Sequence, residues 1–476
     1  MPALFSILYL PGMLTAIKDA LHGIMPWLMY SAIFFTIGAA AIKRSSWGLL
    51  LLILLIPQPN IWYKLHALPL GTETMDLLLL ATIIGISVNG GGFQRPPRTV
   101  LLTCFILMLY AALWNTTLRF NLAIPITTAN RFVEDYKNYV EMILLYFVAY
   151  NAAKTEEDQK RAVALIAFVL FFICLREIRN FSAGTSFSYD KRAAGPFWIV
   201  GLGANHFGSY IAYVGSFILG VLMFDKEKKW RRMLYSAAVC CCVYPLFMTY
   251  SRGAYAAALV ALAVFGVFHK RLILVGIAAL AFTWTTILPT TVVERITMTE
   301  TAEGQIEESA AIRLVLWEKA EELFQRNPIF GIGYQGFSVS VRIGGLNNVH
   351  NFYMQTAAEQ GVIGLIFFAL MILYSGFTGL RLYRVGVTPF QRGMGLGFVG
   401  AVAAIMVSNV FGDRWSYFAL GAMYWILWGL VDRALYNARM LPATVPEAAA
   451  DAASTADTTP APALPEPEPA HTNNWR

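Results

Sequence analysis

The sequence is poor in charged residues: Asp, Glu, Lys and Arg make up only 14% of its 476 residues, against about 25% in a typical soluble domain. Hydrophobic residues make up 57%. Many apolar runs approach the roughly 20 residues that a membrane-spanning helix needs. These runs lack the alternation over about 10 residues that is typical of transmembrane β-strands. The composition therefore excludes a soluble domain and a membrane barrel, and it predicts an all-α polytopic membrane protein.

Cysteine is scarce, and its placement excludes a disulfide framework. The five cysteines are Cys104, Cys174 and the run Cys240-Cys241-Cys242, all within apolar segments and without disulfide or zinc-site spacing. We interpret them as small hydrophobic residues. The N-terminus lacks a basic region, and Pro11-Gly12 interrupts its first apolar run. We therefore expect no cleavable signal peptide.

The motifs that bind nucleotides and metals are missing as well. Without a P-loop or a dinucleotide-binding glycine fingerprint, ATP is not expected to drive this chain, and any transfer must use an activated substrate. The external loops hold no carboxylate or histidine pair at ligand spacing, so we predict no metal and no cofactor. The net charge of +7 comes from basic residues clustered in short loops. That clustering is typical of membrane topology, and no nucleic-acid partner is expected.

The apolar segments predict 12 to 14 transmembrane helices. Residues 1–23 are interrupted by Pro11-Gly12 and by charges, and form either an interfacial helix or an additional span. Residues 46–57 end at Pro57-Gln58-Pro59, which predicts a broken or tilted span. The clearer spans are expected at about residues 24–42, 72–88, 99–115, 136–153, 160–179, 203–224, 231–250, 253–269, 271–288, 352–380, 392–411 and 415–433.

Lysine and arginine in alternate loops set the orientation. When the spans are counted, the basic loops all fall on one side, which is then cytoplasmic. The other loops, at about residues 58–71, 116–135, 180–202 and 289–351 and at Gly412-Asp413, face the exterior. We divide the chain into an N-terminal bundle (1–288), a large periplasmic loop with an amphipathic helix (289–351), C-terminal helices (352–439) and a disordered cytoplasmic tail (440–476), which is rich in Ala, Pro, Thr and acidic residues.

Arg192, Arg252 and Arg313 all lie on the external side, against the positive-inside trend. An arginine at bilayer depth costs about 2.5–3.5 kcal/mol and needs a partner. Arg252 is either an interfacial arginine whose side chain reaches the membrane surface or an anion clamp. Guanidinium groups bind phosphate oxygens bidentately and stay charged at neutral pH, so three of them in one place would fit a diphosphate.

His350 is the candidate base. It closes the external loop whose amphipathic helix, about Glu307 to Arg326, carries Arg313. It is either an interfacial side chain or a general base, because an imidazole with a pKa of about 6.5 accepts a proton near neutral pH. His206 is the weaker alternative. Glu359, about two turns further along, either orients a neighbour or packs structurally.

The order of several motifs resembles the O-antigen ligase and polymerase superfamily over about residues 190 to 430. The quoted residues are Arg192 with Gly195-Pro196-Phe197 and Asn205; Ser251-Arg252-Gly253; Arg313 and Trp317; Pro328-Ile329-Phe330-Gly331-Ile332-Gly333-Tyr334; His350-Asn351-Phe352-Tyr353; and Glu359-Gln360-Gly361-Val362-Ile363-Gly364. His206 departs from the residues that family members more often carry there. The N-terminal half matches nothing specific, which leaves the acceptor open.

The resemblance implies a GT-C-like, metal-independent membrane glycosyltransferase of the bacterial inner membrane. Such an enzyme takes a glycan from an undecaprenyl-diphosphate carrier at the periplasmic face, among membrane lipids. Lipid A-core is the acceptor in ligases, a second carrier-linked glycan in polymerases, and a protein hydroxyl in O-oligosaccharyltransferases. His350 is then the base, Arg252 binds the diphosphate, and Arg313 assists. The substrate-binding residues are Arg192, Asn205, Trp317, Tyr334 and Asn351.

The alternatives differ in class. A ligase leads, a polymerase or protein O-oligosaccharyltransferase uses the same donor, and a transporter of lipid-linked glycans would also need arginines in the membrane. The transporter predicts basic residues along several spans and an internal repeat, and neither is seen. A non-catalytic scaffold would leave the external arginines and His350 without a role.

Overall fold

We analysed a computed structural model of the chain. It describes residues 10–89, 92–181, 188, 191–298, 308–341, 346 and 348–440. The tail expected to be disordered therefore lies outside the described residues, and so does part of the 289–351 loop. The helices are α1 (Leu10–Ile42), α2 (Ser45–Leu55), α3 (Pro59–Trp62), α4 (Thr74–Asn89), α5 (Thr99–Arg119), α6 (Phe132–Ala152), α7 (Glu156–Asn180), α8 (Ala204–Phe224), α9 (Lys229–Met248), α10 (Arg252–Phe268), α11 (Leu272–Ile287), α12 (Thr290–Thr297), α13 (Glu308–Arg326), α14 (Gly336–Ser340), α15 (Phe352–Val385), α16 (Pro389–Val410) and α17 (Phe418–Met440), with 3₁₀ turns at Tyr63–Ala67 and Gly195–Val200.

The all-α polytopic fold is confirmed, and each predicted span coincides with a helix. Among the described residues, five helices are long and apolar enough to cross a membrane: α5, α8, α15, α16 and α17. Two bent pairs raise the number to seven, with angles of 97° after α2 and 108° between α11 and α12. The bend after α2 agrees with the broken span predicted there. The count is lower than the 12 to 14 predicted for two reasons: the apolar helices at Pro26–Ile42, Thr74–Asn89 and Arg252–Phe268 are shorter than 18 residues, and α6, α7 and α9 carry charged residues.

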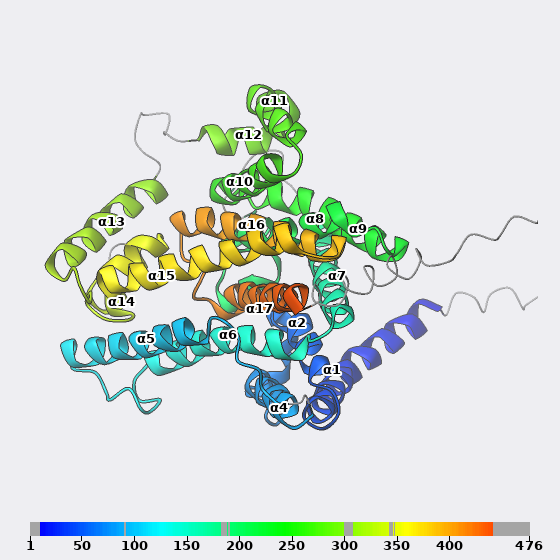
Figure 1. Cartoon of the computed structure of the whole chain (residues 1–476), viewed down its shortest axis with the longest axis horizontal. Coiled ribbons are helices and arrows are strands. Elements are labelled where there is room, and N and C mark those ends of the chain that lie inside the picture. Colours follow the sequence, from blue (N-terminus) through cyan, green and yellow to red (C-terminus); the bar gives the residue numbers. More distant parts are fainter. Residues whose placement is uncertain are drawn as a thin grey trace, which may run out of the picture.

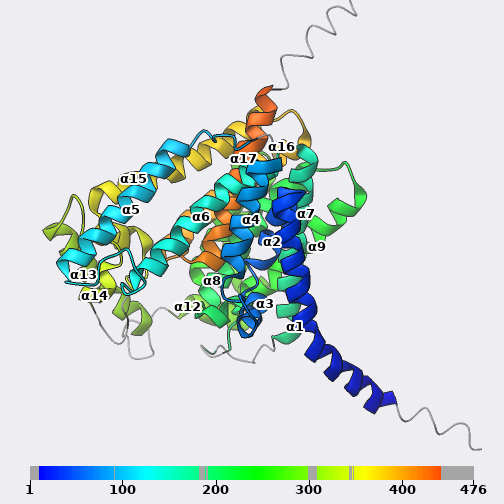
Figure 2. The ribbon, with the colours of Figure 1, turned by 90° about the horizontal axis from the view of Figure 1, so that it is seen from below.

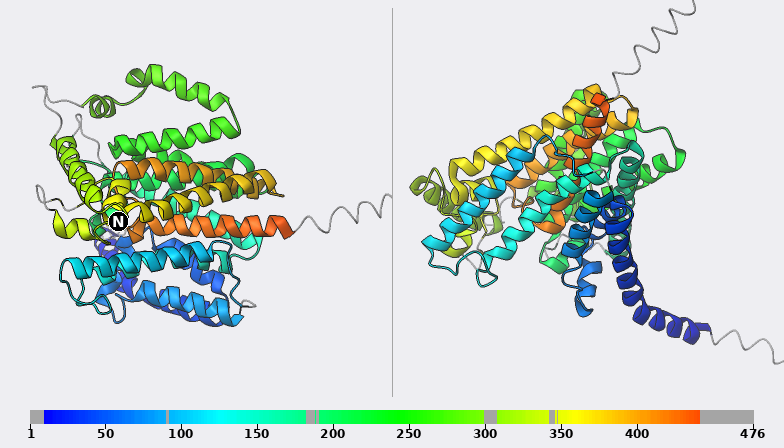
Figure 3. Two further views of the ribbon diagram at one scale, coloured as in Figure 1. Left: turned by 60° about the vertical axis from the view of Figure 1, so that its left-hand side comes forward. Right: turned by 60° about the horizontal axis from the view of Figure 1, so that its bottom comes forward.

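The helices run side by side in a bundle (Figure 1; Figure 3, left). Helix α16 packs against α8, α10 and α15, and α17 packs mainly against α6 and α15. The most apolar 18-residue stretch of α17 is 94% buried, so this helix forms the centre of the bundle. Helices α5 and α15 extend together toward α13 and α14, away from the rest of the bundle (Figure 2).

The basic loops gather at one end of the bundle. Lys160 pairs with Glu227 at 2.6 Å, and Glu156 accepts hydrogen bonds from Thr388 and Gln391. The loops after α6, α8 and α15 therefore meet there. The described parts of the loops at 180–202, 289–351 and Gly412-Asp413, which were predicted to face the exterior, lie at the opposite end together with α13 and α14 (Figure 1). This two-ended arrangement agrees with the loop assignment made from charge.

Helix α15 breaks at Gly361, and the segment after α13 fills the break. Gly361 has φ +64°, and a Cβ there would clash with the carbonyl oxygen of Ile329. The Val362 N–H donates to the Pro328 carbonyl at 2.8 Å, and the Gly333 N–H donates to that of Glu359 at 2.8 Å. The glycine-rich turn thus satisfies backbone groups that a kinked helix leaves unpaired.

Candidate functional site

Arg192 is held by backbone carbonyls at the junction of α9 and α10. Its Nε donates to the Thr249 carbonyl at 2.8 Å and its Nη2 to Asn205 Oδ1 at 2.7 Å. The neighbouring Ala193 N–H donates to the Met248 carbonyl at 2.9 Å, which fixes the loop against the end of α9. The predicted pair of Arg192 and Asn205 therefore comes together, with Asn205 orienting the guanidinium.

Arg252 opens α10, where the Ser251 hydroxyl accepts the N–H of Ala254 as an N-cap. Its Nη1 donates to the Met298 carbonyl at 3.2 Å, just after α12. Helix α12 carries a further arginine, Arg295, which is only 6% exposed. Arg295 interacts electrostatically with Arg252 and with Arg313. Arg295, which the sequence analysis did not select, therefore links Arg252 electrostatically to Arg313.

Trp317 fastens the amphipathic helix to the segment that holds the histidine. The predicted helix is confirmed as α13, and Asn327-Pro328 follows its end at Arg326. The Trp317 indole Nε1 donates to the Val349 carbonyl at 3.1 Å. Leu316 and Ala320 of α13 pack with Phe337 and Val349 in a small separate core. This contact ties α13, and with it Arg313, to the residue before His350.

His350 adopts φ +55°, a backbone conformation that is uncommon for residues other than glycine. Its N–H donates to Asn348 Oδ1 at 2.7 Å. The next residue, Asn351, is the N-cap of α15, and its Oδ1 accepts the N–H of Tyr353 at 3.0 Å and that of Met354 at 3.3 Å. A strained residue held from both sides is typical of functional sites.

A further buried arginine, Arg414, lies in the turn between α16 and α17 and is 5% exposed. Its Nη1 is 2.9 Å from His206 Nε2 and its Nε is 3.3 Å from Ser209 Oγ. A guanidinium offers only donors, so Nε2 of His206 must accept and the ring must be neutral in this contact. His206, the alternative base, is therefore committed to orienting Arg414.

The cations act on one another and on His350. Burial, together with the charges of Arg313 and Arg414, lowers the pKa of His350 to about 4. Burial, with the charges of Arg295 and Arg313, lowers the pKa of Arg192 to about 10. Burial also lowers the pKa of Arg414 to about 10; Asp413 opposes this shift, and the charges of Arg313 and Arg192 add to it. At neutral pH the arginines stay charged and His350 stays neutral. The site thus combines several positive charges with a neutral imidazole.

Two of the proposed substrate-binding residues have structural partners instead of an open position. Tyr334 is 4% exposed, its N–H donates to the Ala112 carbonyl at 3.0 Å, and its carbonyl accepts from Thr116 Oγ1 at 2.6 Å. These bonds anchor the glycine-rich turn on α5. Asn351 acts through the N-cap described above. Glu359 is buried, and its Oε1 accepts the Phe337 N–H at 3.3 Å, so its described contact is with the backbone of α14.

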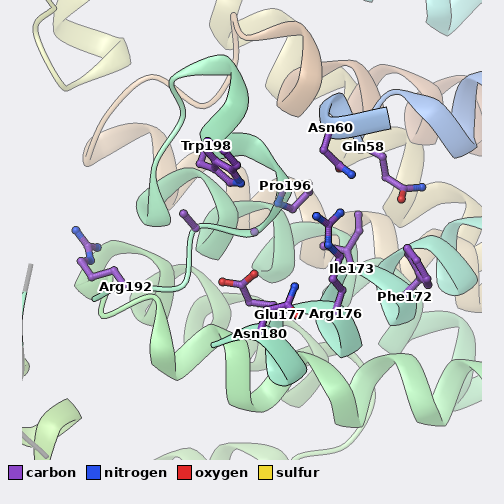
Figure 4. A pocket seen from close by; sticks show the side chains of 12 residues that line it. Gln58, Asn60, Phe172, Ile173, Arg176, Glu177, Asn180, Arg192, Pro196 and Trp198 are labelled. Atoms are coloured by element: carbon purple, nitrogen blue, oxygen red, sulfur yellow. The ribbon is translucent and has the colours of Figure 1, made fainter. Parts of the chain in front are cut away.

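Two cavities adjoin the site. One, of about 260 Å³, has Arg192 at its edge and is lined by Arg176, Glu177 and Asn60 among others (Figure 4). The other, of about 310 Å³, is lined by Arg131, Phe132, Asp135, Gln335, Ser338, Asn348, Gln355, Asp413, Ser416 and Tyr417. Within the described part of the chain, no group of three His, Cys, Asp or Glu residues is arranged to hold a metal ion.

Arg295 and Arg414 were missed because each stands beside an acidic residue, Glu294 and Asp413, and therefore looks like half of a local ion pair. The signal for Arg414 was its place: the turn was already assigned to the external side. Asp413 turns away from it toward the helix start, where its Oδ1 accepts the N–H groups of Trp415 at 2.8 Å and Ser416 at 3.0 Å.

The fold and the site define a multi-pass membrane protein with a cationic, histidine-containing site at one end. Residues 237–369 match the model of a family described as O-Antigen ligase. The matched range runs from within α9 to within α15 and includes Arg252, Arg313 and His350. It confirms the resemblance over this stretch, and members of this family are membrane glycan ligases and polymerases. No curated protein matched the chain.

Proposed function

We propose that the chain transfers a glycan from an undecaprenyl-diphosphate carrier to an acceptor hydroxyl at the periplasmic face of the bacterial inner membrane, as an O-antigen ligase does. The observation that carries this proposal is the bond of Trp317 to the Val349 carbonyl, which holds the helix of Arg313 against the segment of His350. The charges of Arg313 and Arg414 lower the pKa of His350, which agrees with this geometry. A base surrounded by fixed cations suits a reaction in which a hydroxyl loses a proton and a diphosphate leaves. The match to the O-Antigen ligase family supports the same class of reaction.

In the proposed reaction, His350 accepts the proton of the acceptor hydroxyl while the acceptor oxygen attacks the anomeric carbon of the donor glycan. The bond between that carbon and the diphosphate oxygen breaks, and the carrier diphosphate leaves with the electron pair. General-base assistance contributes about 10²–10⁴ in rate. Charge develops on the leaving diphosphate, where preorganised donors stabilise the transition state most.

The arginines divide this task by their surroundings. Arg192 and Arg414 are fixed by neutral acceptors, namely carbonyls, Asn205 and His206, so their charge is not cancelled within those contacts. They suit a rigid diphosphate cradle. Arg313 belongs to α13, which the Trp317 contact joins to the histidine segment. Arg313 is therefore suited to interact with the diphosphate and with His350 at the same time.

The test is reconstitution in proteoliposomes with undecaprenyl-diphosphate glycan and lipid A-core, comparing wild type with His350→Ala. His269→Ala is the matched control, because His269 stacks on Phe224 at the opposite end of the bundle. We expect a single addition to lipid A-core from wild type and from the control, and at least a hundredfold loss in His350→Ala. A ladder of carrier-linked glycan would instead indicate a polymerase, and modification of a supplied peptide would indicate a protein acceptor. Carrier binding without any product would favour the transporter.

A further inference from the structure

The cavity of about 310 Å³ lies beside the arginine and histidine site and has a different chemistry. Two contacts and one pair of consecutive residues connect this cavity with the arginine and histidine site. Asn348, in its wall, accepts the N–H of His350 at 2.7 Å. Tyr417, also in its wall, packs edge-on against the His206 ring with centroids 5.3 Å apart. Asp413 directly precedes Arg414 in the chain.

The charged side chains of this cavity are one arginine, Arg131, and two carboxylates, Asp135 and Asp413. A diphosphate would meet repulsion there, whereas the neighbouring arginines attract it. Arg131 stacks over Phe132 at 4.5 Å and is exposed, so its charge faces solvent as much as the cavity. The cavity therefore does not continue the diphosphate site.

The remaining wall offers what a sugar needs. Amide and hydroxyl groups, which can both donate and accept hydrogen bonds, line the cavity together with aromatic rings. The cavity volume lies at the lower end of the range for small-molecule sites. Asp413 is occupied by the turn that it caps, with its oxygens bonded to Trp415, Ser416 and the Ser416 hydroxyl. Asp135 is exposed in the first turn of α6 and is the carboxylate available to accept two sugar hydroxyls. The neutral polar and aromatic lining groups are Phe132, Gln335, Ser338, Asn348, Gln355, Ser416 and Tyr417.

We propose that this cavity binds a sugar of the acceptor and that Asp135 is its principal hydroxyl-binding group. The proposal rests on the glycan transfer proposed above and narrows it: the acceptor is a glycan, free or on lipid A, and not a protein side chain. His350 then stands at the boundary, with the donor diphosphate on its arginine side and the acceptor hydroxyl on its Asn348 side. That arrangement brings the proton acceptor to the atom that must lose its proton.

The first experiment measures binding without catalysis. The full chain in lipid nanodiscs is titrated with the water-soluble oligosaccharide released from lipid A-core, and separately with inorganic pyrophosphate. We expect saturable oligosaccharide binding that weakens at least tenfold in Asp135→Asn, because the amide replaces one acceptor oxygen by a donor. Pyrophosphate binding should stay the same. Glu134→Gln is the matched control, an exposed neighbour on the same helix turn that does not line the cavity.

The second experiment is kinetic and separates acceptor from donor. Asp135→Asn should raise the KM for lipid A-core at least tenfold and leave the KM for the donor within twofold. A rise in the donor KM alone would assign the cavity to the donor sugar and overturn the proposal. Oligosaccharide binding that is unchanged in Asp135→Asn, or absent in wild type, would also overturn it. If wild type transfers glycan and Asp135→Asn has the same KM for lipid A-core, the sugar-binding role of the cavity would be refuted, whereas the proposal of glycan transfer would stand. Oligosaccharide binding that depends on Asp135, without any transfer, would refute glycan transfer while the cavity stands.

Discussion

The low pKa of His350 predicts an unusual pH profile for the reaction. An ordinary imidazole with a pKa of 6.5 is neutral in about a tenth of molecules at pH 5.5, whereas one with a pKa of about 4 is neutral in nearly all of them. Since the neutral form is the base, kcat/KM should remain near its maximum down to about pH 5 and fall only as pH approaches 4. At pH 5.5 the difference between the two cases is roughly tenfold.

Arg313→Gln tests the cause of this shift. Burial is the larger cause of the low pKa and Arg313 the next, so removing its charge should raise the acid limb of kcat/KM by at most about one pH unit. Bound diphosphate partly cancels the charge of the arginines and so raises the pKa of His350. The acid limb of kcat should therefore lie at a higher pH than the acid limb of kcat/KM. The matched control is Lys319→Gln, which removes a charge from the exposed part of α13, where Lys319 pairs with Glu322.

The assay is the initial rate of transfer by the reconstituted protein between pH 4 and 8, with the donor concentration varied at each pH. A wild-type acid limb near 6.5 would refute the argument that burial and arginine charge suppress protonation of His350. A limb that stays in place or moves downward in Arg313→Gln would refute the part assigned to Arg313. A shift of equal size in Lys319→Gln would show that any cation on α13 suffices.

Three further variants test the geometry. Arg252→Lys keeps the charge but loses the fork, so transfer should fall at least tenfold with unchanged expression, and wild-type activity would indicate a simple interfacial charge. Trp317→Phe removes the bond to the Val349 carbonyl; we expect a loss of about 1 kcal/mol in unfolding free energy and a lower kcat, and a stability loss without a kcat effect would contradict the positioning role. Gly361→Ala forces a Cβ onto the Ile329 carbonyl, and thermal unfolding should show a loss of roughly 1–3 kcal/mol or more; an unchanged transition would disprove the strain.

The sequence predicted where helices form because long apolar runs and their breaks are local features. It predicted the bend after α2 from Pro57 and Pro59, since proline removes a backbone donor. It predicted more spans than the five to seven candidates found by length and hydropathy, because charged residues interrupt α6, α7 and α9 and other apolar helices are shorter than 18 residues. Length and hydropathy do not by themselves distinguish a helix that packs in the bundle from one that crosses the bilayer.

The site was predictable in kind but not in membership. Arg192, Arg313 and His350 stood out because they were polar residues on the external side of an apolar chain. Their approach to one another depends on tertiary packing, such as the contact of Trp317 with Val349, which has no signature in sequence. Arg414 was hidden by its neighbour Asp413, whose carboxylate binds the backbone of the following turn.

The central position of α17 has a consequence for how the protein is made. Helices α6 and α15 precede α17 in the chain, so they leave the ribosome before their common packing partner exists. Its Tyr424 hydroxyl bonds to Ser375 of α15 at 2.6 Å, and its Asp432 accepts from Tyr146 of α6 at 2.7 Å. Before α17 is present, the Tyr146 hydroxyl of α6 lacks its carboxylate partner, whereas Ser375 keeps its bond to the Ile372 carbonyl of its own helix. A nascent chain halted before residue 418 should therefore be a substrate for membrane quality control and not a smaller working enzyme.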